Sequence, residues 1–369
     1  MKNAQIKLKN TPEQIELFKA AASADTVKSM NAREAIAKFI GPVIQQVLNI
    51  ASYTNDLYTP YPYNEDDIPT FPLDLYYGVG INSVVIWSQG SAGGLGSSSV
   101  SGLQEMTLAT FRLDSAINFN NKTIRRGRLP YISLGLNRMA QELLRKIESN
   151  GFYILLKALA EARTNSLEHV IASTATGRLQ LDDFNRLITR SKKLFTAWDG
   201  GTPEDGVSSA GATDIYLSVD RMEDIRAMAY NPQNTIAVPN TDESTSTPLP
   251  DSIREEIFRN AGATELYGKL LHEMLELGVG KRYNTVFDNL YSGATSFDTA
   301  AQELVLGVNQ SKEYGLLKPV AQNADSGETF VTRVDDQWPA RAEKIGWWGS
   351  QELGFICVDP RVLSGVIIK

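Results

Sequence analysis

Histidine and cysteine, the residues that most often carry catalysis or hold metals, are scarce in this chain. Its 369 residues include two histidines, His169 and His272, and one cysteine, Cys357. One cysteine cannot form a disulfide within the chain, and a zinc site would have to borrow carboxylates to reach three protein ligands. A serine or cysteine nucleophile would have only two histidines available as its base. The composition therefore removes much of the common hydrolytic and metal chemistry.

The surroundings of these three residues suggest structural roles. His272 opens the segment His-Glu-Met-Leu-Glu, which resembles half of a zinc-protease helix but lacks the second histidine four residues on. We interpret His272 as a histidine on a helix surface beside acids, and His169 as a residue at the end of a long helix. Cys357 lies in an apolar strand segment, where a small buried hydrophobe is the expected role. No catalytic residue, metal site or cofactor is predicted.

Glycines cluster in residues 90–96, where a phosphate-binding loop would be conceivable. A Walker A loop needs Lys directly after its second Gly, and this stretch contains no Lys. The spacing of a dinucleotide fingerprint also fails, and a strand rather than a helix follows. We interpret residues 90–99 as the tip of a long β-hairpin, with strands predicted at 76–88 and 104–113.

Charge is unevenly distributed along the chain. The 36 basic and 43 acidic residues give a net charge of −7, which argues against tight non-specific DNA binding by the whole surface. The acidic cluster comprises Glu65, Asp66 and Asp67, and the basic cluster comprises Lys122, Arg125, Arg126 and Arg128. Acids in an exposed turn are more often solvated or paired than catalytic. The basic cluster could bind a phosphate backbone, but pairing with acids, in the chain or on a neighbour, is the favoured interpretation.

The N-terminal half mixes helical and extended signals. Thr11 and Pro12 predict the start of a first helix, and a second helix is predicted from Asn31, with a kink or break at Pro42. The stretch 58–72 is rich in Tyr and Pro and predicts extended backbone.

The longest predicted helix runs from Pro130 to Arg163 and carries one apolar face. Ser218 is expected to cap a helix over 219–230 after a strand at 214–217. Loops are predicted at 200–212 and 239–250, a helix at 181–194, and strands at 304–308, 329–334 and 353–358. A capping box at 252–255 indicates the start of another helix. The fold class is therefore α+β.

The sequence predicts neither a membrane-spanning helix nor a signal peptide. No apolar run reaches the roughly 18 residues that a membrane-spanning helix requires, and the first residues lack the apolar core of a signal peptide. A single cysteine fits a reducing compartment.

This order of elements resembles the major capsid proteins of tailed bacteriophages, the Hong Kong 97-type fold. Three stretches carry the resemblance: Phe111-Arg112-Leu113-Asp114 through Lys122 to Leu129-Pro130, Thr213-Asp214-Ile215-Tyr216-Leu217-Ser218 before a helix, and Gly346-Trp347-Trp348-Gly349 with Leu353-Gly354-Phe355 to Val358-Asp359-Pro360-Arg361. The resemblance implies five regions. These are an N-terminal arm (1–55), an extended hairpin called the E-loop (56–110), a peripheral or P-domain with a long spine helix (111–208), an inserted axial or A-domain (209–344), and a return to the P-domain (345–369).

The resemblance also implies a function. Such a protein is not an enzyme and needs no cofactor; it assembles with itself, as pentamers and hexamers, into an icosahedral virion shell built in the host cytoplasm. Its implied partners are scaffolding, portal and decoration proteins, and double-stranded DNA held without sequence specificity at the inner face, with no membrane. The acidic and basic clusters are expected to take part in contacts between subunits. An encapsulin-type compartment shell and, less favoured, a soluble two-domain enzyme stay open as alternatives.

Overall fold

The computed structural model describes residues 11–23, 25–72, 105–126, 128–164, 167–174, 177–194, 211–230, 235–236, 245–246, 265–293, 296–312, 314–324, 326–335 and 343–369. The chain divides into two compact units. Unit 1 comprises Met1–Ser52, Pro60–Arg145 and Lys318–Ile356, and unit 2 comprises Tyr53–Thr59, Lys146–Leu317 and Cys357–Lys369. Both units combine helices with strands, so the predicted α+β class is confirmed.

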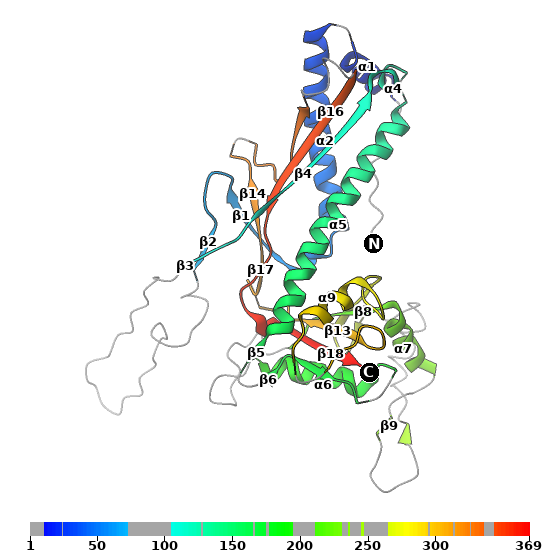
Figure 1. Cartoon of the computed structure of the whole chain (residues 1–369), viewed down its shortest axis with the longest axis vertical. Helices are drawn as coiled ribbons and strands as arrows, with labels where there is room; N and C mark the ends of the chain where they lie inside the picture. Colours follow the sequence, from blue (N-terminus) through cyan, green and yellow to red (C-terminus); the bar gives the residue numbers. More distant parts are fainter. Residues whose placement is uncertain are drawn as a thin grey trace, which may run out of the picture. The chain divides into compact units, whose positions relative to one another are not determined.

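Unit 1 is built on two long antiparallel strands, β4 (Phe111–Asn120) and β16 (Lys344–Leu353), which Figure 1 shows side by side. They pair over their full length, from Asn120 opposite Lys344 to Phe111 opposite Leu353. The sheet is completed by β15 (Val331–Asp335), β14 (Leu316–Gln322), β1 (Thr59–Asn64) and β17 (Ile356–Cys357). The predicted strand over 104–113 is instead two strands, since β3 (Glu105–Thr107) ends before β4 begins.

Two N-terminal helices belong to unit 1, α1 (Pro12–Ala21) and α2 (Thr26–Ala51). The prediction for α1 is confirmed, because the Thr11 side chain accepts a hydrogen bond from the Gln14 amide. The predicted start of the second helix was wrong. Asp25 caps α2 through the Val27 amide, and the helix continues past Pro42 as one element. Packing of α2 on α1 and β15 overrides the local helix-breaking signal.

The core of unit 1 surrounds Trp347. Its ring contacts Phe18 and Phe119, with centroids 6.5 and 6.1 Å away, and its indole N–H donates to the Arg33 carbonyl at 3.3 Å. Helix α5 (Leu129–Glu161) passes close to β4 at Gly135, where an added Cβ would lie 2.7 Å from the Phe119 ring. A side chain at position 135 would therefore push α5 away from the strand.

The long helix predicted over 130–163 is confirmed as α5. In its unit 1 part the predicted apolar face is buried, as at Ile132 and Leu136. In its unit 2 part the predicted face was partly wrong, because Ile154 is 38% exposed while Leu155 and Leu156 are buried.

Unit 2 has its own six-stranded sheet. Its order is β11 (Glu265–Leu266), β12 (Lys269–Met274), β8 (Asp214–Ser218), β13 (Glu303–Val308), β18 (Leu363–Ile368) and β7 (Val170–Ala172). Its helices are α3 (Thr54–Leu57), α6 (Leu181–Leu194), α7 (Val219–Tyr230) and α9 (Arg282–Leu290). Apolar residues of α6, α7 and this sheet form one core cluster. The predictions for α6, β8 and α7 are confirmed, including the cap, since Ser218 Oγ accepts from the Arg221 amide at 3.2 Å.

Two interpretations of histidines were wrong. His272 lies in strand β12, not on a helix, because residues 270–274 pair in parallel with β8. His169 does not end the long helix but precedes β7, fully buried. Its Nδ1 lies 2.8 Å from the Leu363 carbonyl oxygen and its Nε2 lies 2.9 Å from Thr164 Oγ1. Burial lowers the pKa of His169, which favours the neutral ring.

The predicted hairpin is described only at its base. Strands β2 (Thr70–Pro72) and β3 pair antiparallel, with Thr70 opposite Thr107 and Pro72 opposite Glu105. The predicted strand at 76–88, the glycine-rich stretch, most of the 200–212 loop and the capping box at 252–255 lie outside the described residues. Further short elements are α4 (Asn121–Arg125), β5 (Arg163–Thr164), β6 (Leu167–Glu168), β9 (Thr235–Ile236), β10 (Thr245–Ser246) and a 3-10 helix (Pro360–Val362).

Candidate functional site

The acidic cluster occupies the turn between β1 and β2. The Glu65 amide donates to the Gln322 carbonyl at 3.0 Å, and the Asp67 amide donates to the Asn64 carbonyl at 2.9 Å. These bonds fix the turn against the end of β14. The three carboxylate side chains are all exposed. The backbone of the cluster is therefore fixed, and its carboxylates form a negative surface that faces solvent.

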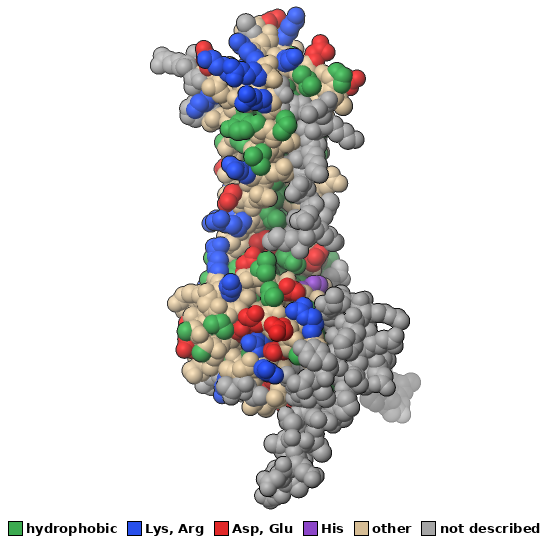
Figure 2. All heavy atoms as spheres, turned by 90° about the vertical axis from the view of Figure 1, so that its right-hand side faces the viewer, with side chains coloured by type: hydrophobic (Ala, Val, Ile, Leu, Met, Phe, Trp, Pro, Cys, Tyr) green, Lys and Arg blue, Asp and Glu red, His purple; other side chains and the backbone are tan. Residues whose placement is uncertain are grey.

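The basic cluster surrounds the short helix α4, which Asn120 caps by accepting from the Lys122 amide at 2.9 Å. Arg125 makes a bond within the chain, because its Nε donates to the Ala22 carbonyl at 2.9 Å and ties α4 to α1. Lys122, Arg126 and Arg128 are exposed, and none forms an ion pair with another residue of the described part of the chain. Figure 2 shows Lys and Arg side chains gathered at the top of the view, at the end of unit 1 with α1 and α4.

Strand β4 separates the two clusters. Glu65 shares a small hollow with Arg112, near the start of β4, whereas Asn120 at its end caps α4. Eight residues of strand at about 3.3 Å per residue span roughly 26 Å. The structure therefore does not bring the acidic and basic clusters together within one chain.

A groove of about 390 Å³ runs between β4 and α5 in unit 1. Its wall includes Tyr131 and Leu134, whose exposed fractions of 58% and 50% are high for large apolar side chains. Within the described residues, β4 pairs only with β16, so its outer edge offers unpaired backbone groups. Further exposed apolar side chains of unit 1 are Val27, Met30, Phe39 and Ile68. Exposed apolar side chains and an unpaired strand edge of this kind are typical of surfaces that contact another chain.

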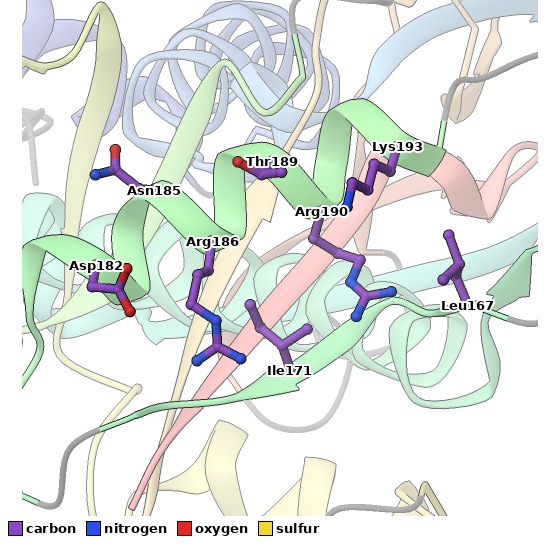
Figure 3. A pocket seen from close by; sticks show the side chains of 8 residues that line it. All are labelled: Leu167, Ile171, Asp182, Asn185, Arg186, Thr189, Arg190 and Lys193. Atoms are coloured by element: carbon purple, nitrogen blue, oxygen red, sulfur yellow. The ribbon is translucent and has the colours of Figure 1, made fainter. Parts of the chain in front are cut away.

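Sequence reasoning missed a second positive surface, in unit 2. Helix α6 and strands β6 and β7 enclose a hollow of about 410 Å³, which Figure 3 shows from close by. Arg186, Arg190 and Lys193 line it from α6. Their spacing of four and then three residues on a helix that the sequence did predict is the signal that would have found them.

One cluster in unit 2 has the residue types of a catalytic triad. His272 Nε2 lies 2.8 Å from Asp214 Oδ1, and Thr213 Oγ1 donates to Asp214 Oδ2 at 2.7 Å. In this cluster the Thr213 hydroxyl and the His272 ring thus bond the same carboxylate and not each other, as a nucleophile and its base would. The Tyr216 ring stacks on His272 with centroids 4.7 Å apart. This arrangement binds β12 to β8 and is not a nucleophile–base pair.

Other charged groups of unit 2 form buried structural pairs. Asp359 is fully buried and lies 2.8 Å from both Lys312 Nζ and Arg361 Nη2. Burial by itself would raise the pKa of Asp359, but the hydrogen bonds from Arg361 and Lys312 outweigh it and hold that pKa below its ordinary value. Within the described ranges, no group of three or more His, Cys, Asp and Glu is placed to hold a metal ion. The helices of the described part include none that is long and apolar enough to span a membrane.

Comparison with known proteins gives a likeness in structure only. No protein-family model matches the chain, and no curated protein matches its sequence at a significant level. The capsid of the cyanophage P-SCSP1u is similar at 13% identity and a TM-score of 0.49, over 86% of this chain and 88% of that chain. A virus-like particle from Pyrococcus furiosus is similar at 11% identity and a TM-score of 0.44, over 90% and 99%.

An encapsulin complex from Synechococcus elongatus is similar at 9% identity and a TM-score of 0.39, over 84% of each chain. Solved phage capsids are thus among the structures that this chain resembles, as its sequence predicted. Identities this low give a likeness in fold alone, so the function proposed below rests on the residues of this chain.

Proposed function

We propose that this chain is the structural subunit of an icosahedral capsid shell, assembling with itself as pentamers and hexamers around double-stranded DNA. The observation that carries the proposal is the separation of the two charge clusters. Both are exposed, they are opposite in sign, and roughly 26 Å of strand keeps them apart in one subunit. Their charges can be paired with each other only between copies.

The surfaces beside the clusters support the same proposal. The groove with Tyr131 and Leu134 and the open edge of β4 supply apolar area and backbone hydrogen-bonding groups next to the charges. Stable interfaces combine an apolar centre with a polar rim in this way. Charge pairs alone would give weak contacts, so a stable shell needs the apolar surfaces as well as the charge clusters.

The five regions named in the sequence analysis are part of this proposal. Residues 1–55 form the arm, 56–110 the E-loop, 111–208 the P-domain, 209–344 the A-domain, and 345–369 the return. The antiparallel β2–β3 pairing supports an E-loop, because it places Pro72 opposite Glu105, the residues that flank positions 73–104. The proposed setting is the virion, assembled in the host cytoplasm, with scaffolding, portal and decoration proteins as further partners.

Electron microscopy of the purified chain tests the proposal. Shells or rings of five and six subunits are expected, and discrete monomers or small oligomers at all concentrations would refute it. The contents of purified shells decide between the two shell functions. Nuclease-protected DNA supports a viral capsid, whereas a protein cargo without nucleic acid would favour an encapsulin-type compartment.

A further inference from the structure

The hollow beside α6 is a concentrated positive surface in a chain of net charge −7. Arg186 and Arg190 are one helical turn apart and Lys193 follows within the next turn, so their attachment points span about 10 Å along the helix axis. In Figure 3, Arg186 and Arg190 both extend from α6 toward β7, on either side of Ile171. The two guanidinium groups thus face the same space above an apolar floor.

Within the described residues, the lining of the hollow holds three cations, Arg186, Arg190 and Lys193, and one carboxylate, Asp182. Asp183 is buried and accepts hydrogen bonds from the Thr174 and Gln180 amides at 2.9 and 3.2 Å. Asp183 Oδ1 lies 3.9 Å from Arg186 Nη1, which is long for an ion pair. Arg190 has no hydrogen bond or ion pair to any described residue. Like charges one turn apart destabilise a helix, so this arrangement favours an anion in the hollow.

Arg186 is held in place by the fold. Its Nη1 donates to the carbonyl of Ala172 in β7 at 3.0 Å, which sets the guanidinium over the last strand of the sheet. Guanidinium groups present a planar set of donors that matches phosphate oxygens, and a partly fixed one loses less entropy on binding. The hollow is therefore prepared for a row of phosphate groups.

We propose that the α6 groove, lined by Arg186, Arg190 and Lys193, binds the phosphate backbone of nucleic acid. The inference rests on the proposed function, which places double-stranded DNA inside the shell. An acidic protein segment is the competing occupant. This chain has an exposed acidic segment, the acidic cluster, but in the proposed shell that cluster pairs with the basic cluster on α4. The α6 cations therefore remain available for nucleic acid.

The test measures binding of a short labelled DNA duplex of arbitrary sequence to the full chain by fluorescence anisotropy. The changed protein is Arg190→Gln/Lys193→Gln, which keeps the Arg186 bond to β7. Each phosphate contact adds about 0.9 to the slope of log affinity against log salt, so removing two contacts lowers the slope by about 1.8. The loss of affinity between about 50 and 200 mM salt should then become about 12-fold smaller than in the unchanged protein.

A matched control removes two exposed lysines from α5, Lys146→Gln/Lys157→Gln, and should leave the slope unchanged. An equal drop in slope for the control would overturn the inference, because the effect would then come from net charge. Poly-glutamate and tripolyphosphate serve as competitors at equal charge. If poly-glutamate displaces the labelled duplex as strongly as unlabelled duplex does, the groove is assigned to an acidic protein segment. If tripolyphosphate does so, the groove is assigned to a small phosphorylated ligand. Either result would overturn the inference.

Shell formation is scored separately by microscopy on the same samples. If the inference holds, Arg190→Gln/Lys193→Gln forms shells but retains less DNA. Absence of shells from the unchanged protein contradicts the proposed function, while the binding of duplex by unassembled subunits still tests the groove.

Discussion

Reversing one charge cluster should raise the protein concentration at which shells form. The structure selects Arg126 and Arg128 for the change to Glu, because Arg125 is needed to tie α4 to α1. The opposite change is Asp66→Lys/Asp67→Lys, which leaves Glu65 and its contact with Asn323 in place. All four substituted side chains are exposed, so neither variant should unfold the subunit.

The size of the effect follows from the exposure of these groups. An exposed ion pair contributes about 0.5 kcal/mol, so losing two pairs and gaining two repulsions of similar size costs about 2 kcal/mol per contact. In the proposed shell each subunit offers its acidic cluster to one neighbour and its basic cluster to another, which amounts to one such contact per subunit. A cost of about 2 kcal/mol lowers an association constant roughly 30-fold. The threshold concentration for assembly should therefore rise roughly 30-fold for either variant.

Light scattering measured against protein concentration gives this threshold. The decisive sample is the chain that carries both variants, with all four substitutions together. Because the charges are exchanged, its contacts are complementary again and its threshold should return close to that of the unchanged protein. The control Lys146→Glu/Lys157→Glu alters net charge by the same amount as the Arg variant, at exposed positions of α5. In about 1 M salt, where charges are screened beyond about 3 Å, the differences should shrink. A threshold that matches the control, or a combined chain that fails to recover, would refute the pairing of the two clusters.

Three further predictions concern the subunit itself. Asp359→Asn leaves Lys312 and Arg361 without their buried counter-charge and should cost about 3–5 kcal/mol of unfolding free energy in a urea titration. The pKa of Asp359 is lower in the folded state, so its contribution to stability is present above about pH 4 and is lost as the pH falls through the folded-state pKa. The unchanged protein should therefore lose more stability in acid than Asp359→Asn does. Equal losses would contradict this. Gly135→Ala should lower the stability by about 1–3 kcal/mol despite the better helix propensity of Ala, because its Cβ meets an aromatic ring of β4; an unchanged melting temperature would show that the ring moves aside. Burial raises the pKa of the half-buried Cys357 thiol to about 12, so a disulfide reagent at pH 8 should react with it much more slowly in the folded than in the unfolded chain, and equally fast labelling of both would contradict this.

Local signals in the sequence sufficed for elements that carry their own start and stop residues. The side chain of Thr11 and the hydroxyl of Ser218 each bond the amide expected of a helix cap, and α1 and α7 begin where they were predicted. Pattern failed where a distant partner decided the structure. Leu271 and Met274 are three residues apart and mimic a helix face, but residues 270–274 form a strand because β8, more than fifty residues earlier, pairs with them.

The candidate sites follow the same division. The acidic and basic clusters are visible as runs of like charge, but only the length of β4 shows that they cannot meet within one subunit. Arg186 and Arg190 are readable as helix neighbours, yet the hollow exists because Ile171 and Leu167 of another segment supply its opposite wall. Such walls are contacts between segments, and a pattern along one segment does not contain them.

The net charge of −7 describes how a subunit behaves at long range, whereas function depends on where the charge is placed. An acidic subunit is repelled by other copies and by nucleic acid until opposite patches come within about a Debye length, roughly 8 Å at physiological salt. Contacts then form only in orientations that match patch to patch. In the proposed shell, because each exposed pair contributes only about 0.5 kcal/mol, a wrongly placed subunit would dissociate readily, while a completed shell would combine many such contacts with apolar burial. Weak, directional charge pairs are poor stabilisers of a single fold, but they are suited to selecting the right neighbour many times over.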